Sequence, residues 1–90
     1  MSCCKAVALI VNKRGLHARA SAKLVECASR FQSHVTVSKD GQTVDARSIM
    51  GLMLLAAPLG SDIEISAAGD DAQDALTAIL ALVEAKFGED

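Results

Sequence analysis

Hydrophobic and polar residues alternate with different periods along the chain, and each period predicts a different element. Residues 5–11 are aliphatic and partly β-branched, which predicts a strand with Val7, Leu9 and Val11 on one face. In residues 18–31 the apolar side chains recur at steps of three and four, as they do along one face of a helix. The polar segment between these two is therefore predicted to be a loop.

The middle of the chain predicts a hairpin and then a short helix. Residues 35–37 indicate a second strand, and Asp40-Gly41 favours a tight turn because both residue types tolerate positive φ. Residues 43–45 form the predicted returning strand. The apolar segment 49–55 is predicted to be the short helix, and a Pro-Leu-Gly sequence follows it as a break.

The last third of the chain predicts one more strand and one more helix. Ile63 and Ile65 alternate with polar residues, and Gly69-Asp70-Asp71 leads into the helix. The inner face of this helix is predicted to hold Ala72, Ala75, Leu76, Ile79, Val83 and Phe87. The resulting order, βαββαβα, indicates a single α+β domain over residues 1–90 with helices on one face of a sheet.

Composition and charge narrow the classes of function. Apolar residues make up 51% of the chain and charged residues 22%, which excludes a disordered chain. Two Phe and no Trp or Tyr argue against nucleic-acid binding, because base stacking needs aromatic faces. Residues 1–50 carry eight Lys or Arg and three acids, whereas residues 51–90 carry one Lys and eight acids. The first half is therefore expected to meet an anionic partner.

Three cysteines and short apolar runs indicate a cytoplasmic protein. Cys3, Cys4 and Cys27 form no disulfide framework, and neither cysteine nor histidine spacing suits a metal, so we expect no metal and no cofactor. Cys27 is predicted to be a buried helix residue. The apolar runs are too short to cross a membrane, and no secretory signal is expected.

The loop Gly15-Leu16-His17-Ala18-Arg19 carries the candidate chemistry. It precedes the first predicted helix, whose unpaired N–H groups can bind an anion, and no Ser, Thr, Asp or Asn stands there to cap them. Arg14 and Arg19 add cations suited to phosphate, and imidazole is a nucleophile near neutral pH. Gly15 allows close approach of a partner. This combination predicts a carrier that holds a phosphoryl group on His17.

Simpler roles exist for each histidine. His17 alone could merely cap the helix beside a solvated Arg19, and the alternative function is a regulatory domain that binds an anionic metabolite there without covalent chemistry. His34 starts a strand and is interpreted as structural or exposed. No Ser-His-Asp, Cys-His or paired-carboxylate grouping supports a self-contained hydrolase, so a stand-alone catalyst is not expected.

Two motifs resemble those of the HPr family, the histidine-containing phosphocarriers of the bacterial phosphoenolpyruvate-dependent phosphotransferase system. The first is residues 15–19 followed by Ala20-Ser21-Ala22, and the second is Arg47-Ser48-Ile49-Met50-Gly51-Leu52-Met53. The resemblance covers nearly the whole chain and implies an open-faced β-sandwich, with a four-stranded antiparallel sheet covered on one face by three helices. Ala20 departs from the proline of many members. Together with the complete Ser48 motif, it favours a regulatory rather than a sugar-transport branch.

The resemblance also implies roles and partners. His17 would be phosphorylated on Nδ1 by enzyme I and would pass the phosphoryl group to an enzyme IIA-type protein, with Arg19 stabilising it. That role requires His17 to lie outside the regular helix, because residues two apart in a helix do not face each other. Ser48 resembles the serine that HPr kinase/phosphorylase modifies, and it is also predicted to cap the second helix. A monomer is expected.

The second helix predicts a contact surface for these partners. Residues 49–55 are apolar on every side, although a short helix on a sheet buries only one stripe, so part of the segment should be exposed. Leu52 and Leu55 are predicted to be core. The resemblance implies which residues bind partners: Arg14, Gly15, Leu16, Ala18, Arg47, Ile49, Met50 and Met53.

Overall fold

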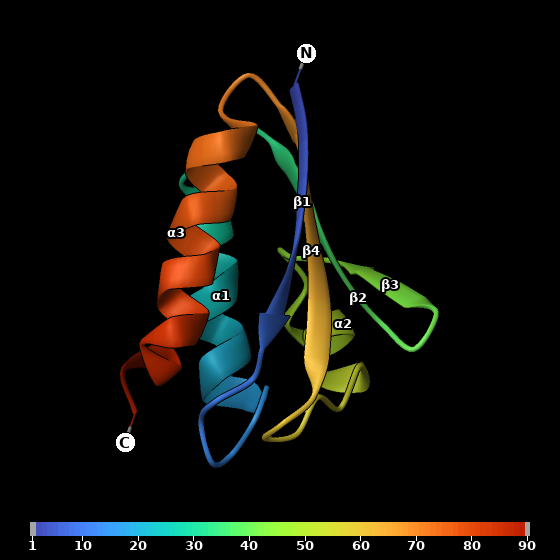
Figure 1. Ribbon diagram of the computed structural model, residues 1–90, viewed down its shortest axis with the longest axis vertical. Helices are drawn as coiled ribbons and strands as arrows, with labels where there is room; N and C mark the ends of the chain where they lie inside the picture. The colour runs from blue at the N-terminus through green and yellow to red at the C-terminus, as the bar shows by residue number, and fades with distance from the viewer. Residues whose placement is uncertain (1, 90) are drawn as a thin grey trace.

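A computed structural model describes residues 2–89 and gives the predicted order of elements (Figure 1). The elements are β1 (Ser2–Leu9), α1 (Ala18–Ser29), β2 (His34–Lys39), β3 (Gln42–Asp45), α2 (Ile49–Leu54), β4 (Asp62–Gly69), α3 (Ala72–Glu84) and a 3₁₀ turn (Lys86–Gly88). The predicted α+β class and the βαββαβα order are confirmed. None of the helices formed by residues 2–89 has the length and apolar character that crossing a membrane requires.

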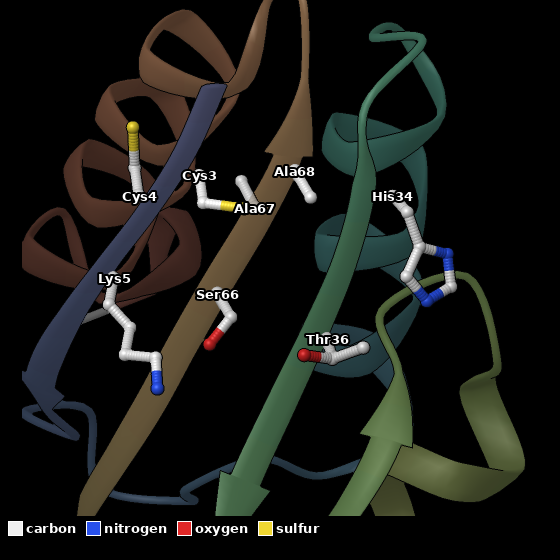
Figure 2. Close-up of a pocket in the computed structure, with 8 residues that line it drawn as sticks. All are labelled: Cys3, Cys4, Lys5, His34, Thr36, Ser66, Ala67 and Ala68. Carbon is white, nitrogen blue, oxygen red and sulfur yellow. The ribbon is translucent and has the colours of Figure 1, made fainter. Parts of the chain in front are cut away.

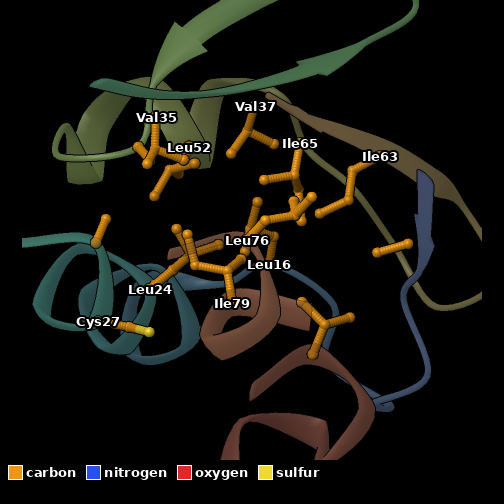
Figure 3. Packing of buried hydrophobic residues seen from close by; sticks show 14 of the residues in the cluster. Leu16, Leu24, Cys27, Val35, Val37, Leu52, Ile63, Ile65, Leu76 and Ile79 are labelled. Atoms are coloured by element: carbon orange, nitrogen blue, oxygen red, sulfur yellow. The ribbon is translucent and has the colours of Figure 1, made fainter. Parts of the chain in front are cut away.

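The four strands form one antiparallel sheet in the order β1-β4-β2-β3. Its inner face packs against the helices, and its outer face is open (Figure 1). Val37 of β2 lies beside Ile65 of β4, and Ile63 lies beside Ala8 of β1. These four side chains are buried with Leu24 of α1, Leu52 of α2 and Ile79 of α3 (Figure 3). The expected open-faced sandwich is therefore confirmed.

The first strand differs from its prediction in its bounds, and the structure decides which of its faces is buried. It spans Ser2–Leu9 rather than residues 5–11, and Val11 lies beyond it. Val7 and Leu9 are 63% and 52% exposed on the outer face, whereas Ala8 and Ile10 are buried. Because residues 6–11 are apolar at every position, the pattern does not show which face of the strand is buried. Val7 and Leu9 share one face, as predicted, and that face is the exposed one.

Two helix ends also differ from prediction. Helix α1 ends at Ser29, and Phe31 lies beyond it, half-buried. Helix α3 ends at Glu84, but Phe87 is still fully buried, because the turn after the helix returns its ring to the core. Lys86 and Phe87 have φ of 59° and 55°, so this turn is left-handed and not a continuation of the helix. The apolar period alone does not show where α3 ends.

Candidate functional site

His17 occupies the N-cap position of α1 and lies outside the regular helix. Its backbone is extended, with φ −75° and ψ −179°, and its carbonyl accepts the first helical hydrogen bond from Ser21 N–H at 2.8 Å. The imidazole makes no side-chain cap to the helix. The requirement that His17 lie outside the helix is therefore met, and the simpler role of His17 as a side-chain cap is wrong.

The loop before His17 packs against the backbone of residues 57 and 58. Gly15 has φ +64°, and a Cβ built on it would lie 2.3 Å from the Ala57 carbonyl oxygen. The Leu16 N–H donates to that same oxygen at 2.9 Å, and Ser21 Oγ donates to the Leu16 carbonyl at 3.1 Å. Gly15 and Leu16 are both buried. The prediction that Leu16 belongs to the partner-binding surface is wrong for its side chain, since this leucine anchors the loop in the core.

Two further residues reach the imidazole site, and the sequence prediction missed both. Glu89 Oε2 lies 2.7 Å from His17 Nε2, and Glu89 Oε1 accepts a hydrogen bond from Asn12 Nδ2 at 2.8 Å. Asn12 is fully buried and also donates to the Gly15 carbonyl at 2.8 Å. Asn12 stands in the predicted polar loop, but Glu89 is 72 positions from His17, and no local pattern connects them.

The charges around this site favour an ionised Glu89. The hydrogen bond from Asn12 lowers the pKa of the Glu89 carboxyl most, although partial burial opposes this. The hydrogen bond and charge of His17, and the positive charge of Arg14, lower that pKa further. Glu89 is therefore a carboxylate at neutral pH, with both oxygens accepting.

A cleft of about 300 Å³ lies beside His17 and joins the two predicted motifs. Arg14, Leu16 and His17 line it from the first loop, and Met53 lines it from α2, together with residues 56–58. The segments that carry the two motifs thus border one cleft.

Among the predicted cations, Arg14 and Arg19 are exposed near the loop, as is Ala18. Arg47 is exposed as well, but its guanidinium donates to the Phe31 carbonyl at 2.6 Å and so also supports the loop after α1. Beside it, Ser48 Oγ accepts a hydrogen bond from Gly51 N–H at 3.0 Å, which confirms the predicted N-cap of α2.

Helix α2 presents an apolar surface to solvent, which we call the α2 patch. It consists of Ile49, Met50, Met53 and Leu54, with exposed fractions of 41%, 77%, 45% and 70%. Leu52 and Leu55 are buried, as predicted. The sequence prediction named the first three members and missed Leu54, because segment 49–55 is apolar throughout and only the packing decides which side faces water.

The second histidine lies apart from this site. His34 is exposed at the start of β2, with Nδ1 4.0 Å from Asp45 Oδ2. It borders a shallow hollow of about 360 Å³ on the outer face of the sheet, with Lys5 and Thr36 (Figure 2). This end of the sheet is opposite the one where α1 begins (Figure 1). The interpretation of His34 as an exposed residue is confirmed.

Comparison with known proteins gives one consistent family. A family model for the PTS HPr component phosphorylation site matches residues 5–85. Phosphocarrier protein HPr of Cupriavidus necator is 54% identical over 80 residues, which are 89% of this chain and 90% of that protein. Phosphocarrier protein NPr of Shewanella violacea is 45% identical over 80 residues, or 89% of this chain and 88% of that protein. The crystal structure of HPr-C-His from Thermoanaerobacter tengcongensis has a TM-score of 0.93 at 45% identity and covers 97% of this chain and 98% of that one.

These matches cover most of the described fold. The family model includes both motifs and all four strands, at least in part. The identity to the curated relatives is well above what chance similarity gives, and the structural match agrees with the sequence matches. The chain belongs to the HPr family of phosphocarriers of the phosphotransferase system, and proteins of that system are its partners.

Proposed function

We propose that His17 receives a phosphoryl group on Nδ1 from phosphorylated enzyme I and passes it to an enzyme IIA-type protein. The observation that carries this proposal is the contact of Nε2 with Glu89, which leaves Nδ1 as the ring nitrogen free to react. His17 also stands at the N-terminus of α1, where backbone N–H groups favour an anion. Arg19 is exposed two positions further on and adds a cation for the phosphoryl oxygens.

The α2 patch and its flanking arginines form the proposed docking surface. Met53 lines the cleft beside His17, so a partner that reaches the imidazole also contacts α2. Flexible methionines suit a surface that must fit several partners. Arg14 and Arg47 supply an exposed positive rim that attracts acidic partner surfaces. Ala18 lies at the same exposed end of α1.

Phosphoryl labelling tests the proposal directly. The protein is incubated with enzyme I and labelled phosphoenolpyruvate, and the stability and position of the label are measured. We expect an acid-labile, base-stable label on His17 that is absent from His17→Ala and retained in His34→Ala. A wild-type protein that takes no label, or a His17→Ala variant that is labelled equally, contradicts the proposal. If no label forms but inorganic phosphate binds and depends on His17, the non-covalent alternative holds.

The identity of the acceptor defines the branch of the system. The departure at Ala20 and the complete Ser48 motif lead us to propose a regulatory acceptor rather than a sugar-transport enzyme II. Transfer from the labelled protein to purified enzyme IIA proteins of each branch is the measurement. Faster transfer to a sugar-transport IIA contradicts this assignment.

We also propose Ser48 as a regulatory phosphorylation site for an HPr kinase/phosphorylase. Its hydroxyl lies at the N-terminus of α2, next to Ile49 and Met50 of the α2 patch. A phosphate there adds roughly two negative charges to the docking surface. We expect Ser48→Asp to raise the KM for enzyme I severalfold, and the neutral cap in Ser48→Asn to leave it unchanged. Equal KM values for the two variants contradict regulation by charge.

A further inference from the structure

We propose that Glu89 is a positioning residue for His17: its carboxylate holds the imidazole as the Nε2–H tautomer and so leaves the lone pair on Nδ1. This inference rests on the proposed phosphorylation of His17 at Nδ1. It concerns a residue outside both sequence motifs, contributed by the segment that follows α3.

The two oxygens of Glu89 each receive one donor. Oε1 accepts from Asn12 Nδ2 at 2.8 Å, and Oε2 lies 2.7 Å from His17 Nε2. An ionised carboxylate only accepts hydrogen bonds, so the Nε2 that contacts it carries the proton. In a neutral imidazole the other nitrogen, Nδ1, then has the free electron pair.

A second hydrogen bond of Asn12 determines which atom of its side-chain amide faces Glu89. Its Nδ2 also donates to the Gly15 carbonyl oxygen at 2.8 Å, and the Asn12 residue is fully buried. Turning this amide over would place Oδ1 against that carbonyl oxygen, two acceptors facing each other. Asn12 therefore presents a donor to Glu89 Oε1, which leaves Oε2 as the acceptor that faces His17 Nε2.

The segment that carries Glu89 is anchored to the core. Phe87, two residues before it, is fully buried, and Lys23 Nζ of α1 donates to the Phe87 carbonyl at 2.6 Å. The contact itself is largely shielded, because the side chains of His17 and Glu89 are 18% and 20% exposed. This shielding strengthens the charge-assisted hydrogen bond relative to one at a fully exposed site.

The arrangement suits each direction of phosphoryl transfer. The Nδ1 lone pair forms the new bond to phosphorus, while the bond from phosphorus to the donor breaks and its electron pair leaves with the donor. No proton leaves the ring, since Nε2–H is retained, and the ring gains a formal positive charge that the Glu89 carboxylate faces. Transfer to an acceptor reverses these changes and restores the neutral ring.

The tautomer is measurable without any phosphorylation. We propose ¹⁵N NMR of the His17 ring nitrogens in the full chain, at a pH about two units above the ordinary histidine pKa of about 6.5. Wild type should be mainly the Nε2–H form. In Glu89→Gln, the side-chain oxygen accepts from Asn12 and the amide NH₂ faces Nε2, so we expect a shift towards the Nδ1–H form. The matched control Glu84→Gln removes the same charge from an exposed position of α3 and should resemble wild type.

Transfer kinetics give the second measurement. We expect kcat for phosphoryl acceptance to fall roughly tenfold in Glu89→Gln, with little change in KM. The reason is that the attraction between the Glu89 carboxylate and the His17 ring is strongest in the transition state, when the ring becomes positive. Glu89→Asp keeps the charge but shortens the side chain. We expect its kcat to fall as well, because the proposed role needs the contact with Nε2 and not the charge alone.

The outcomes separate this inference from the proposed function. A Glu89→Gln variant with the wild-type tautomer and kcat overturns the role of Glu89, while labelling of His17 still stands. If wild type is never labelled at His17, the proposed function fails, and the tautomer measurement alone still decides what Glu89 does. A wild-type ring in the Nδ1–H form overturns the inference at once.

Discussion

At the scale of single residues, Gly15 determines where the His17 loop sits. Its φ of +64° is a conformation that side chains disfavour, and an added Cβ would overlap the Ala57 carbonyl oxygen. We expect Gly15→Ala to lower the free energy of unfolding by about 3 kcal/mol, the sum of left-handed strain and a backbone overlap. Urea unfolding monitored by circular dichroism measures this loss.

Gly41→Ala is the matched control for that prediction. Gly41 also has a positive φ, of +83°, but nothing lies within 4 Å of a Cβ built on it. Only the conformational strain applies there, so we expect a loss of about 1 kcal/mol. Equal losses in the two variants would show that Gly15 does not need its close approach to the segment that follows α2.

At the scale of elements, one carboxylate joins the turn after α1 to the start of α3. Asp71 accepts hydrogen bonds from the backbone N–H groups of Gln32 and Ser33, both at 2.9 Å, and from the Ser33 hydroxyl. It stands at the N-cap of α3 but makes no side-chain cap to that helix. The Asp71 side chain therefore links two elements rather than capping its own helix.

These hydrogen bonds make a pH-dependent contribution to stability. The Ser33 hydroxyl, followed by the Gln32 N–H, holds the pKa of Asp71 below its ordinary value of 3.8. A lowered pKa in the folded state contributes stability that is complete above the ordinary pKa and is lost as the pH falls through the folded one. Asp71→Asn should therefore lower the melting temperature near pH 7, and its difference from wild type should shrink below about pH 4.

Asp74→Asn provides the comparison for this pH effect. Asp74 is an exposed carboxylate in the first turn of α3, so its substitution removes a similar charge near the helix dipole without touching the turn after α1. Thermal unfolding of the two variants across pH 2–8 is the measurement. If Asp71→Asn loses no more stability than Asp74→Asn at any pH, the link between the two elements contributes nothing.

At the scale of the whole molecule, local periodicity explains how far the sequence predicted this fold and site. The order of elements and the Ser48 cap follow from patterns within a few residues. The orientation of β1 does not, because its apolar residues fill both faces and only packing against the helices selects one. Contacts between distant positions are equally absent from local patterns, which is why Glu89 beside His17 was missed.

The two halves of the chain, which differ in charge, meet at the site. The basic first half supplies His17 and Arg14, whereas Glu89 belongs to the acidic second half. The net charge of the chain is −2, yet the exposed groups next to His17 in the sequence include Arg14 and Arg19. The fold thus places one shielded carboxylate against Nε2 of the imidazole and leaves Arg14 and Arg19 exposed, an arrangement that suits the proposed phosphoryl transfer.

The two exposed apolar faces of the molecule predict different behaviour in transfer. Met50 lies on the α2 patch, and Val7, almost as exposed, lies on the outer face of the sheet. If partners dock on α2, Met50→Gln should raise the KM for enzyme I roughly fivefold, because a contact in a docking surface is worth about 1 kcal/mol. Val7→Thr makes a comparable polar change at similar shape and should leave that KM unchanged. Steady-state phosphorylation assays measure both, and an effect confined to Val7→Thr would place docking on the open sheet face instead.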